Sequence, residues 1–158
     1  MGVLSGHAQD VKSVRWHPER DQLFSASYDD TLKAWSYENS VDEWVCKYTM
    51  RGHTSSVWAF DFDPSGKYIV SCSDDKTWII WSVSETGAKR LITVGDTHFR
   101  AIYSVSWSRQ LTEGKHRIAT VGADNQLFVH EISDELLTQA AEQEEADPSI
   151  RPTLLAQI

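Results

Sequence analysis

Short apolar runs separated by turn residues follow one another along most of this chain. Each run has five or six residues, which is short for a helix, and the runs are rich in valine, isoleucine and aromatic residues. The intervals between them carry turn formers such as Pro18, Pro64 and Gly66. The pattern predicts short antiparallel strands at 11–16, 23–27, 31–35, 44–49, 57–62, 68–72, 77–81 and 89–93.

These strands fall into two copies of one unit. His53 follows His7 by 46 residues, and the same interval links a whole set of positions without a gap. Gly6, His7, Val11, Pro18, Ser25, Ser27, Asp29, Thr31 and Trp35 recur as Gly52, His53, Val57, Pro64, Ser71, Ser73, Asp75, Thr77 and Trp81. A duplication of this kind indicates a repeat protein in which each unit is one supersecondary element.

A third, more divergent copy follows. His98, Ile102, Val105 and Trp107 occupy the positions of His7, Val11, Val14 and Trp16, and Thr120, Gly122 and Asp124 those of Ser25, Ser27 and Asp29. The spacing between these two groups grows by four residues within 110–116, which predicts a longer hairpin loop. His130 stands where the first two copies have tryptophan.

The Gly-His pair, the Ser-x-Ser-x-Asp-x-Thr run and the tryptophan 28 residues after the histidine resemble the WD40 repeat. This resemblance implies an all-β fold of propeller blades, each a four-stranded antiparallel sheet. We expect a single partial propeller over 1–158, with blades at about 4–50, 51–95 and 96–158. The resemblance also implies a buried hydrogen-bond network in each blade, formed by His7, Ser25, Ser27, Asp29 and Trp35, by His53, Ser71, Ser73, Asp75 and Trp81, and by His98 and Asp124.

Charge is concentrated in one segment. Of the net charge of −8, the stretch 131–147 carries seven acidic residues and no Lys or Arg, so −1 is left for the rest. A nearly neutral body disfavours a nucleic-acid surface, which needs clustered cations. Within the acidic segment, Ser133 is a candidate N-cap for a helix with a weak apolar face that ends before Pro148. A solvated linker over 133–147 is the slightly favoured alternative to a docked helix, and 152–158 is expected to form a fourth strand.

Composition limits where the chain acts. It has no run of 18 apolar residues and no secretory signal pattern, so we expect a cytosolic or nuclear protein without membrane contact. Cys46 and Cys72 are expected to be two buried thiols rather than a disulfide.

The repeated His, Ser and Asp would also compose a hydrolase triad. A structural role is favoured, because the trio occurs in each of the first two units and an enzyme has no need for one triad per repeat. The six histidines and two cysteines show no metal-ligand spacing, and no phosphate loop or nucleophile elbow is present. We therefore expect a binding protein without catalytic residues, metal or cofactor.

Blade geometry in the family assigns partner contacts to residues beside the first valine of each unit and before the turn aspartate. In this chain they are Asp10, Lys12, Tyr28, Ser56, Trp58, Asp74 and Tyr103. In the third unit, Ala101 stands where the first unit has Asp10, and Ala123 stands where it has Tyr28. Tyr28, Trp58 and Tyr103 are the strongest candidates, because aromatic residues with a polar edge are favoured at binding hot spots. The alternative is that Trp58 packs between blades.

The order of motifs is more specific than any single one. Residues 4–107 resemble the WD40 proteins of cytosolic iron-sulfur protein assembly well. The resemblance lies in the order of the motifs, with Trp16-His17-Pro18 and Trp44-Val45-Cys46 at the same places among the repeated residues. The resemblance implies a scaffold that helps to pass clusters to cytosolic and nuclear apoproteins, with targeting-complex subunits and apoprotein clients as partners. A WD40 adaptor in RNA processing, chromatin or ubiquitin ligation is the alternative.

That family closes seven blades, whereas three can be traced here. An open array exposes apolar faces and strand edges at its ends. The expectation is therefore an internal piece of a larger ring, or else self-association or pairing with another half-propeller.

Overall fold

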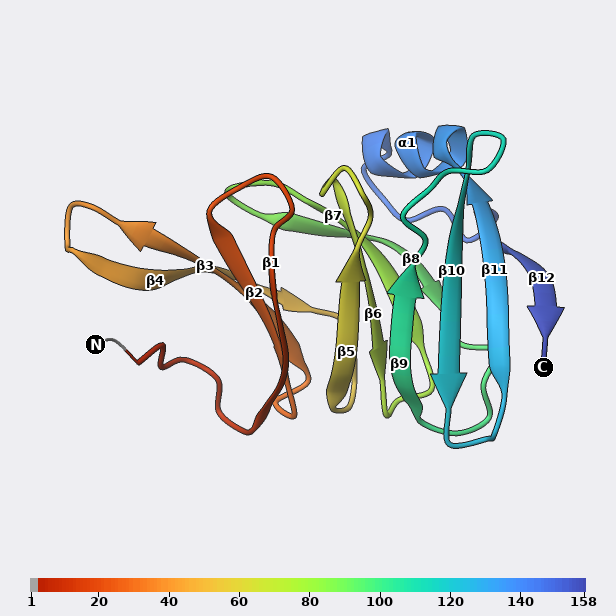
Figure 1. Ribbon diagram of the computed structural model, residues 1–158, viewed down its shortest axis with the longest axis horizontal. Helices are drawn as coiled ribbons and strands as arrows, with labels where there is room; N and C mark the ends of the chain where they lie inside the picture. The colour runs from red at the N-terminus through yellow and green to blue at the C-terminus, as the bar shows by residue number, and fades with distance from the viewer. Residues whose placement is uncertain (1–2) are drawn as a thin grey trace.

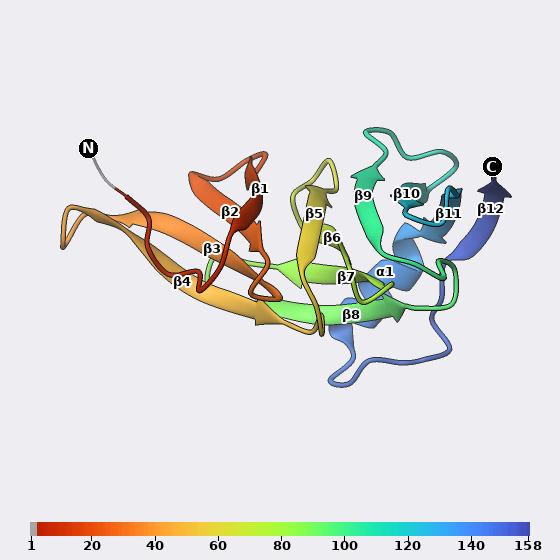
Figure 2. The ribbon, with the colours of Figure 1, turned by 90° about the horizontal axis from the view of Figure 1, so that it is seen from below.

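The computed structural model describes residues 3–158 and consists of three four-stranded antiparallel sheets, which we call blades 1, 2 and 3. They stand side by side along the long axis of the molecule, with the two ends of the chain at opposite extremes (Figures 1 and 2). The expected all-β architecture of propeller blades is confirmed.

Each blade is a meander of consecutive strands. Blade 1 comprises β1 (Val11–Trp16), β2 (Gln22–Ser27), β3 (Thr31–Glu38) and β4 (Glu43–Arg51), and blade 2 comprises β5 (Val57–Phe62), β6 (Tyr68–Ser73), β7 (Trp78–Val83) and β8 (Ala88–Val94). Blade 3 comprises β9 (Ile102–Trp107), β10 (Lys115–Gly122), β11 (Leu127–Ser133) and β12 (Thr153–Gln157), with the helix α1 (Asp134–Glu142) between its last two strands. The predicted strands agree with these to within a few residues, and the third unit gains its extra residues in the β9–β10 loop.

The second hairpin turn of each blade uses the same backbone device. Asp30, Lys76 and Asn125, each directly after the turn aspartate, have positive φ values of 68°, 69° and 62°. Such left-handed residues are typical of tight hairpin turns and are tolerated best by Gly, Asn and Asp. The turn aspartates are thereby held in equivalent places in the three blades.

The core lies between the blades rather than within them. Phe24, Leu32, Phe60, Phe62 and Trp81 belong to the cluster between blades 1 and 2. A second cluster joins blades 2 and 3 and includes Trp78, Ile80, Ile102, Val105 and Trp107. Apolar burial is the main favourable term in folding, so the blades stabilise one another.

Polar contacts cross each junction beside these clusters. The Arg15 guanidinium donates to the Phe60 carbonyl at 2.9 Å, and the Trp107 amide donates to the Asp61 carboxylate at 2.9 Å. His17, which the sequence only places in a turn, is buried and contacts the Gly66 carbonyl of blade 2 through Nε2 at 2.9 Å. Gly66 has a φ of 71°, and a Cβ there would lie 2.5 Å from the His17 ring, so this close approach requires glycine.

The expected acidic helix near the C-terminus is confirmed over Asp134–Glu142, and because it is docked the slightly favoured view of a solvated linker is wrong there. Ser133 Oγ caps α1 by accepting from the Leu136 amide at 3.2 Å, and Leu137 and Ala140 are buried. At the other end, Lys89 of β8 donates to the carbonyls of Ala140 and Ala141 at 3.3 and 3.0 Å and to that of Gln143. A cation at a helix C-terminus also complements the helix dipole. Blade 2 therefore holds a helix that blade 3 supplies (Figure 2).

The expectation of two buried thiols is wrong for one of them. Cys46 is exposed on β4, whereas Cys72 is buried on β6, and both are free. Burial raises the pKa of Cys72 to about 12, so this thiol stays protonated at neutral pH. None of the helices in residues 3–158 is long and apolar enough to cross a membrane.

Candidate functional site

Two sets of residues were singled out by the sequence, and the structure places them differently. The polar set is inside the blades. The aromatic set is partly exposed, and its Trp58 also packs against the core between blades 2 and 3.

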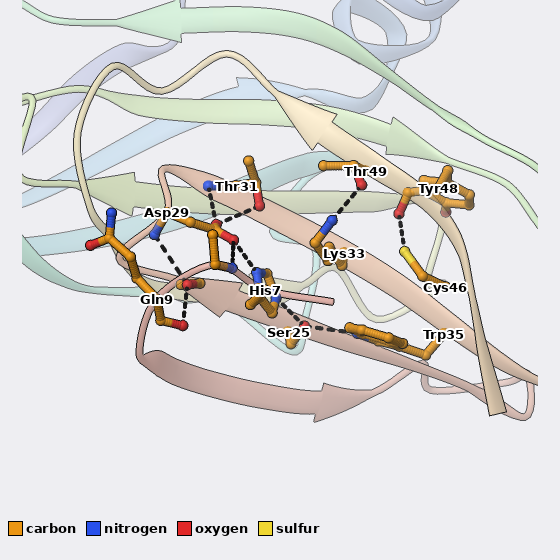
Figure 3. A network of polar contacts seen from close by, with 12 residues as sticks. His7, Gln9, Ser25, Asp29, Thr31, Lys33, Trp35, Cys46, Tyr48 and Thr49 are labelled. Atoms are coloured by element: carbon orange, nitrogen blue, oxygen red, sulfur yellow. Dashed lines mark hydrogen bonds and ion pairs between the residues drawn. The ribbon is translucent and has the colours of Figure 1, made fainter. Parts of the chain in front are cut away.

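In blade 1 the polar set forms one continuous chain (Figure 3). Trp35 Nε1 donates to Ser25 Oγ at 2.8 Å, Ser25 Oγ lies 2.7 Å from His7 Nε2, and His7 Nδ1 lies 2.8 Å from the Asp29 carboxylate. Asp29 also accepts from the Thr31 hydroxyl and amide at 2.6 and 3.1 Å. The chain therefore ties the segment before β1 to β2, β3 and the turn between them.

Ser27 makes a second, separate link. Its Oγ donates to the Gln9 carbonyl at 3.1 Å and accepts from the Asp29 amide at 3.1 Å. It is not part of the Trp-Ser-His-Asp chain.

Blade 2 repeats the arrangement within a few tenths of an ångström. Trp81 Nε1 donates to Ser71 Oγ at 2.9 Å, Ser71 Oγ lies 2.7 Å from His53 Nε2, and His53 Nδ1 lies 3.0 Å from Asp75. Ser73 Oγ bonds the Ser55 carbonyl at 2.8 Å, as Ser27 bonds that of Gln9.

Blade 3 keeps two of the three links of the chain and lacks the one from tryptophan. His98 Nδ1 lies 2.9 Å from Asp124, and its Nε2 lies 2.9 Å from Thr120 Oγ1. His130 makes no hydrogen bond among the described residues, and burial lowers its pKa to about 4. Its ring lies 5.0 Å from that of Trp78, which stands where blade 1 has the smaller Leu32. The large Trp78 of blade 2 thus fills the space left where blade 3 has His130 instead of tryptophan.

The network's electrostatics suit a structural role. Although burial of the carboxyl works in the opposite direction, hydrogen bonds from Thr31, the Ala8 amide and His7 lower the pKa of Asp29 to about 2. In blade 2, burial is again outweighed, by bonds from His53 and Thr77, and the pKa of Asp75 is held well below its usual range. The carboxylates are therefore charged at neutral pH and accept hydrogen bonds from several sides.

The serines are poorly placed for nucleophilic attack. Ser71 is fully buried and Ser25 nearly so, and the Oγ of each already accepts a tryptophan N–H. A triad nucleophile instead needs an accessible Oγ and donors aimed at a developing oxyanion. No group of three His, Cys, Asp or Glu side chains within residues 3–158 is arranged to hold a metal ion.

The aromatic set forms a row across the three blades. The ring of Trp58 lies 5.2 Å from that of Tyr28 and 5.3 Å from that of Tyr103, both edge to face. Lys12 Nζ lies 3.9 Å above the Tyr28 ring, a cation–π contact. We call Lys12, Tyr28, Trp58 and Tyr103 the aromatic row.

A bulge in the first strand of each blade explains why these side chains share one surface. The pairing of β1 with β2 shifts between Val11 and Ser13, that of β5 with β6 between Val57 and Ala59, and that of β9 with β10 where Tyr103 lies. The extra residues are Lys12, Trp58 and Tyr103. A β-bulge turns its residue away from the regular alternation and is frequent beside binding sites. Periodicity alone does not reveal these bulges.

Two carboxylates flank the row. Asp74 is exposed and accepts from Trp58 Nε1 at 3.3 Å, and Asp10 is exposed and lies 3.4 Å from Lys12 Nζ. Ser56 is partly buried beside them, and its carbonyl accepts from the Asp74 amide at 3.0 Å. All seven predicted contact residues therefore lie at the edges of the three blades where the bulges occur.

Comparison with known proteins gives the same repeat. The family model described as "WD domain, G-beta repeat" matches residues 1–36 and 44–82. The chain is 39% identical over 129 residues to a probable cytosolic iron-sulfur protein assembly protein CIAO1 homolog of Ixodes scapularis, covering 80% of this chain and 39% of that protein. It is also 30% identical to the probable cytosolic iron-sulfur protein assembly protein 1 of Pyricularia oryzae, covering 82% of this chain and 37% of the relative.

Proteins with other printed roles match at similar identity, and the nuclear distribution protein PAC1 of Yarrowia lipolytica is 31% identical over 80% of this chain and 31% of its own length. Pre-mRNA-processing factor 19 of Bos taurus is 34% identical over 59% of this chain, which covers 17% of that protein. This chain thus spans less than two-fifths of the length of each of these relatives. The matched repeats, the three four-stranded blades and the network that joins His7 to Asp29 and His53 to Asp75 show that the chain belongs to the WD40-repeat family.

Proposed function

We propose that this protein is a non-enzymatic adaptor that binds other proteins through the aromatic row and acts in cytosolic iron-sulfur protein assembly. The observation that carries the binding role is the row itself. The three blades turn the bulged side chains of Lys12, Trp58 and Tyr103 onto one surface. There the Trp58 ring is in edge-to-face contact with the rings of Tyr28 and Tyr103. Aromatic residues placed in this way dominate the energetics of many protein interfaces.

The assignment to iron-sulfur protein assembly is supported by two relatives with that printed role that match 80% and 82% of the chain. On this proposal the chain works in the cytosol and contributes a surface rather than cluster ligands. Its partners are subunits of the targeting complex and the apoproteins that receive clusters.

The test is co-purification of the tagged full chain with candidate targeting-complex subunits, using the double variant Trp58→Ala with Tyr103→Ala. We expect about a tenfold or greater loss of partner recovery, as for hot-spot truncation. Tyr37→Ala is the matched control, because Tyr37 is an exposed aromatic on β3 outside the row. Equal loss in the control, or retention in the double variant, would refute the role of the row.

A second candidate is an adaptor in another WD40 assembly, which the similarity to Pre-mRNA-processing factor 19 favours. The same purification separates the two. Recovery of splicing proteins in a Trp58-dependent manner, without iron-sulfur targeting subunits, would support the second candidate and reject the first.

A further inference from the structure

Two arginines from different blades converge on one buried carboxylate. The side chain of Asp61, on β5 of blade 2, is only 4% exposed. Arg15 of blade 1 places its Nε 3.6 Å from Asp61 Oδ1, and Arg109, which follows β9 of blade 3, donates to the same oxygen from Nη2 at 3.3 Å. Both guanidinium groups therefore approach blade 2, and the cluster is formed by three adjacent blades. We call Arg15 and Arg109 the arginine pair.

Asp61 does not neutralise both arginines. Its Oδ2 accepts from the Trp107 amide at 2.9 Å, and its Oδ1 accepts from the Phe62 amide at 3.1 Å as well as from Arg109. These contacts fix the carboxylate within blade 2, and each arginine reaches it through a single nitrogen. Two guanidinium groups and one carboxylate leave one positive charge in excess.

The arginine pair keeps most of its hydrogen-bond donors free. Within residues 3–158, Arg15 Nε donates to the Phe60 carbonyl at 2.9 Å and Arg109 Nη2 donates to Asp61, and neither side chain makes another hydrogen bond. A guanidinium carries five N–H donors. Because the two side chains are 48% and 64% exposed, the remaining donors are accessible to an incoming group.

A cavity joins these groups. Its volume is about 250 Å³, and Arg15, Asp61 and Arg109 all line it. Asp61 is the one acidic residue in this lining, and Pro18 and Phe62 contribute apolar surface. An anionic group that enters the cavity therefore meets an excess of positive charge beside an apolar wall.

The charge of the cluster favours a carboxylate over a phosphate. A carboxylate carries one negative charge and matches the single positive charge in excess, whereas a phosphate group carries about −1.5 to −2 at neutral pH. The additional negative charge of a phosphate would be repelled by the buried Asp61. Guanidinium groups bind carboxylates with two parallel hydrogen bonds, and the methylenes of a glutamate side chain suit the surface of Pro18.

We infer that the arginine pair is a docking site for an acidic side chain of a partner protein. The aromatic row occupies the second residue of β5 and β9, whereas Asp61 is next to last in β5 and Arg109 follows β9 (Figure 1). The two surfaces lie at opposite ends of the first strands, so one partner at each end can be held at the same time. The inference is independent of the proposed function, because it uses no residue of the aromatic row.

The test is a titration of the full chain with an acetylated and amidated triglutamate peptide at constant ionic strength, followed by the NMR signals of the arginine Nε–H groups. We expect saturable shifts at Arg15 and Arg109, and at least about fivefold weaker binding of inorganic phosphate. Arg109→Gln should weaken peptide binding at least about tenfold, as for the loss of a charge-assisted hydrogen bond. Arg100→Gln is the matched control, because Arg100 is an exposed arginine just before β9, and it should bind normally.

Charge reversal separates loss of docking from loss of the fold. Arg109→Glu leaves the cluster with one negative charge in excess, so this variant should lose the triglutamate peptide and gain affinity for an acetylated trilysine peptide. Trp58→Ala should leave triglutamate binding unchanged, which keeps this test separate from that of the aromatic row. Absence of shifts at the arginine pair, equal losses in Arg109→Gln and Arg100→Gln, or phosphate binding as tight as that of the peptide would overturn the inference. An Arg109→Glu variant that binds trilysine no better than the unaltered chain would also overturn it.

Discussion

Replacing Ser71 by alanine is expected to be among the most damaging small changes in the molecule. Ser71 is fully buried, and its Oγ accepts from Trp81 Nε1 at 2.9 Å and lies 2.7 Å from His53 Nε2. Alanine removes one oxygen and leaves two buried polar groups without that partner. An unsatisfied buried group costs about 1–3 kcal/mol, so the free energy of unfolding should fall by about 2–6 kcal/mol.

The assay is urea unfolding followed by circular dichroism at one fixed protein concentration, because association would add stability. Ser84→Ala is the control, since Ser84 is an exposed serine that also makes hydrogen bonds, and its loss should cost within about 0.5 kcal/mol. Ser25→Ala should resemble Ser71→Ala, because the contacts are the same. A loss below about 1 kcal/mol for Ser71→Ala would show that the chain of hydrogen bonds does not hold the blade together.

Three further predictions follow from the same contacts. The pKa of Asp29 is about 2 in the fold and about 3.9 in an unfolded chain, so its stabilisation is complete above about pH 5 and is lost as the pH falls through the folded value of about 2; Asp29→Asn should flatten this part of the stability profile measured by urea unfolding. Lys89→Met removes the cation at the end of α1 and should cost about 1 kcal/mol, with faster amide exchange over 134–142 and unchanged exchange in blade 1. His130→Trp restores the residue of the other repeats but meets Trp78, and thermal unfolding should show a loss of about 1–3 kcal/mol through overpacking; a gain in stability would contradict the size compensation.

The strands were predictable because each is a short apolar run bounded by turn residues, and the repeat supplied a second copy as a check. The repeat also identified His7, Asp29 and their counterparts as one set, because polar residues that recur at buried positions must satisfy one another. Sequence reasoning slightly favoured a solvated acidic segment over the docked helix that is present. The deciding contact is Lys89, which lies more than 50 residues away on another blade.

Other features were missed for similar reasons. Nothing in the alternation around Cys46 shows that β4 is the outer strand of its blade and leaves that thiol in solvent. The contact of His17 with Gly66 depends on how two blades meet, and a single blade's pattern does not contain it. The bulges are likewise invisible to a period-two pattern, although the family resemblance singled out the residues that occupy them.

The three blades vary in a way that separates scaffold from surface. At the buried chain, blade 3 has Thr120 in place of serine, and its His130 in place of tryptophan lies against the large Trp78 of blade 2. At the bulge, the blades carry Lys12, Trp58 and Tyr103, which differ in size and charge while the backbone device stays the same. The side chains at these bulges are only partly buried, so they can differ more from blade to blade than the core residues do. The buried residues repeat from blade to blade, whereas the residues at the bulged edge differ. Such a fold is suited to recognition, because binding specificity can change at that edge while the core stays the same.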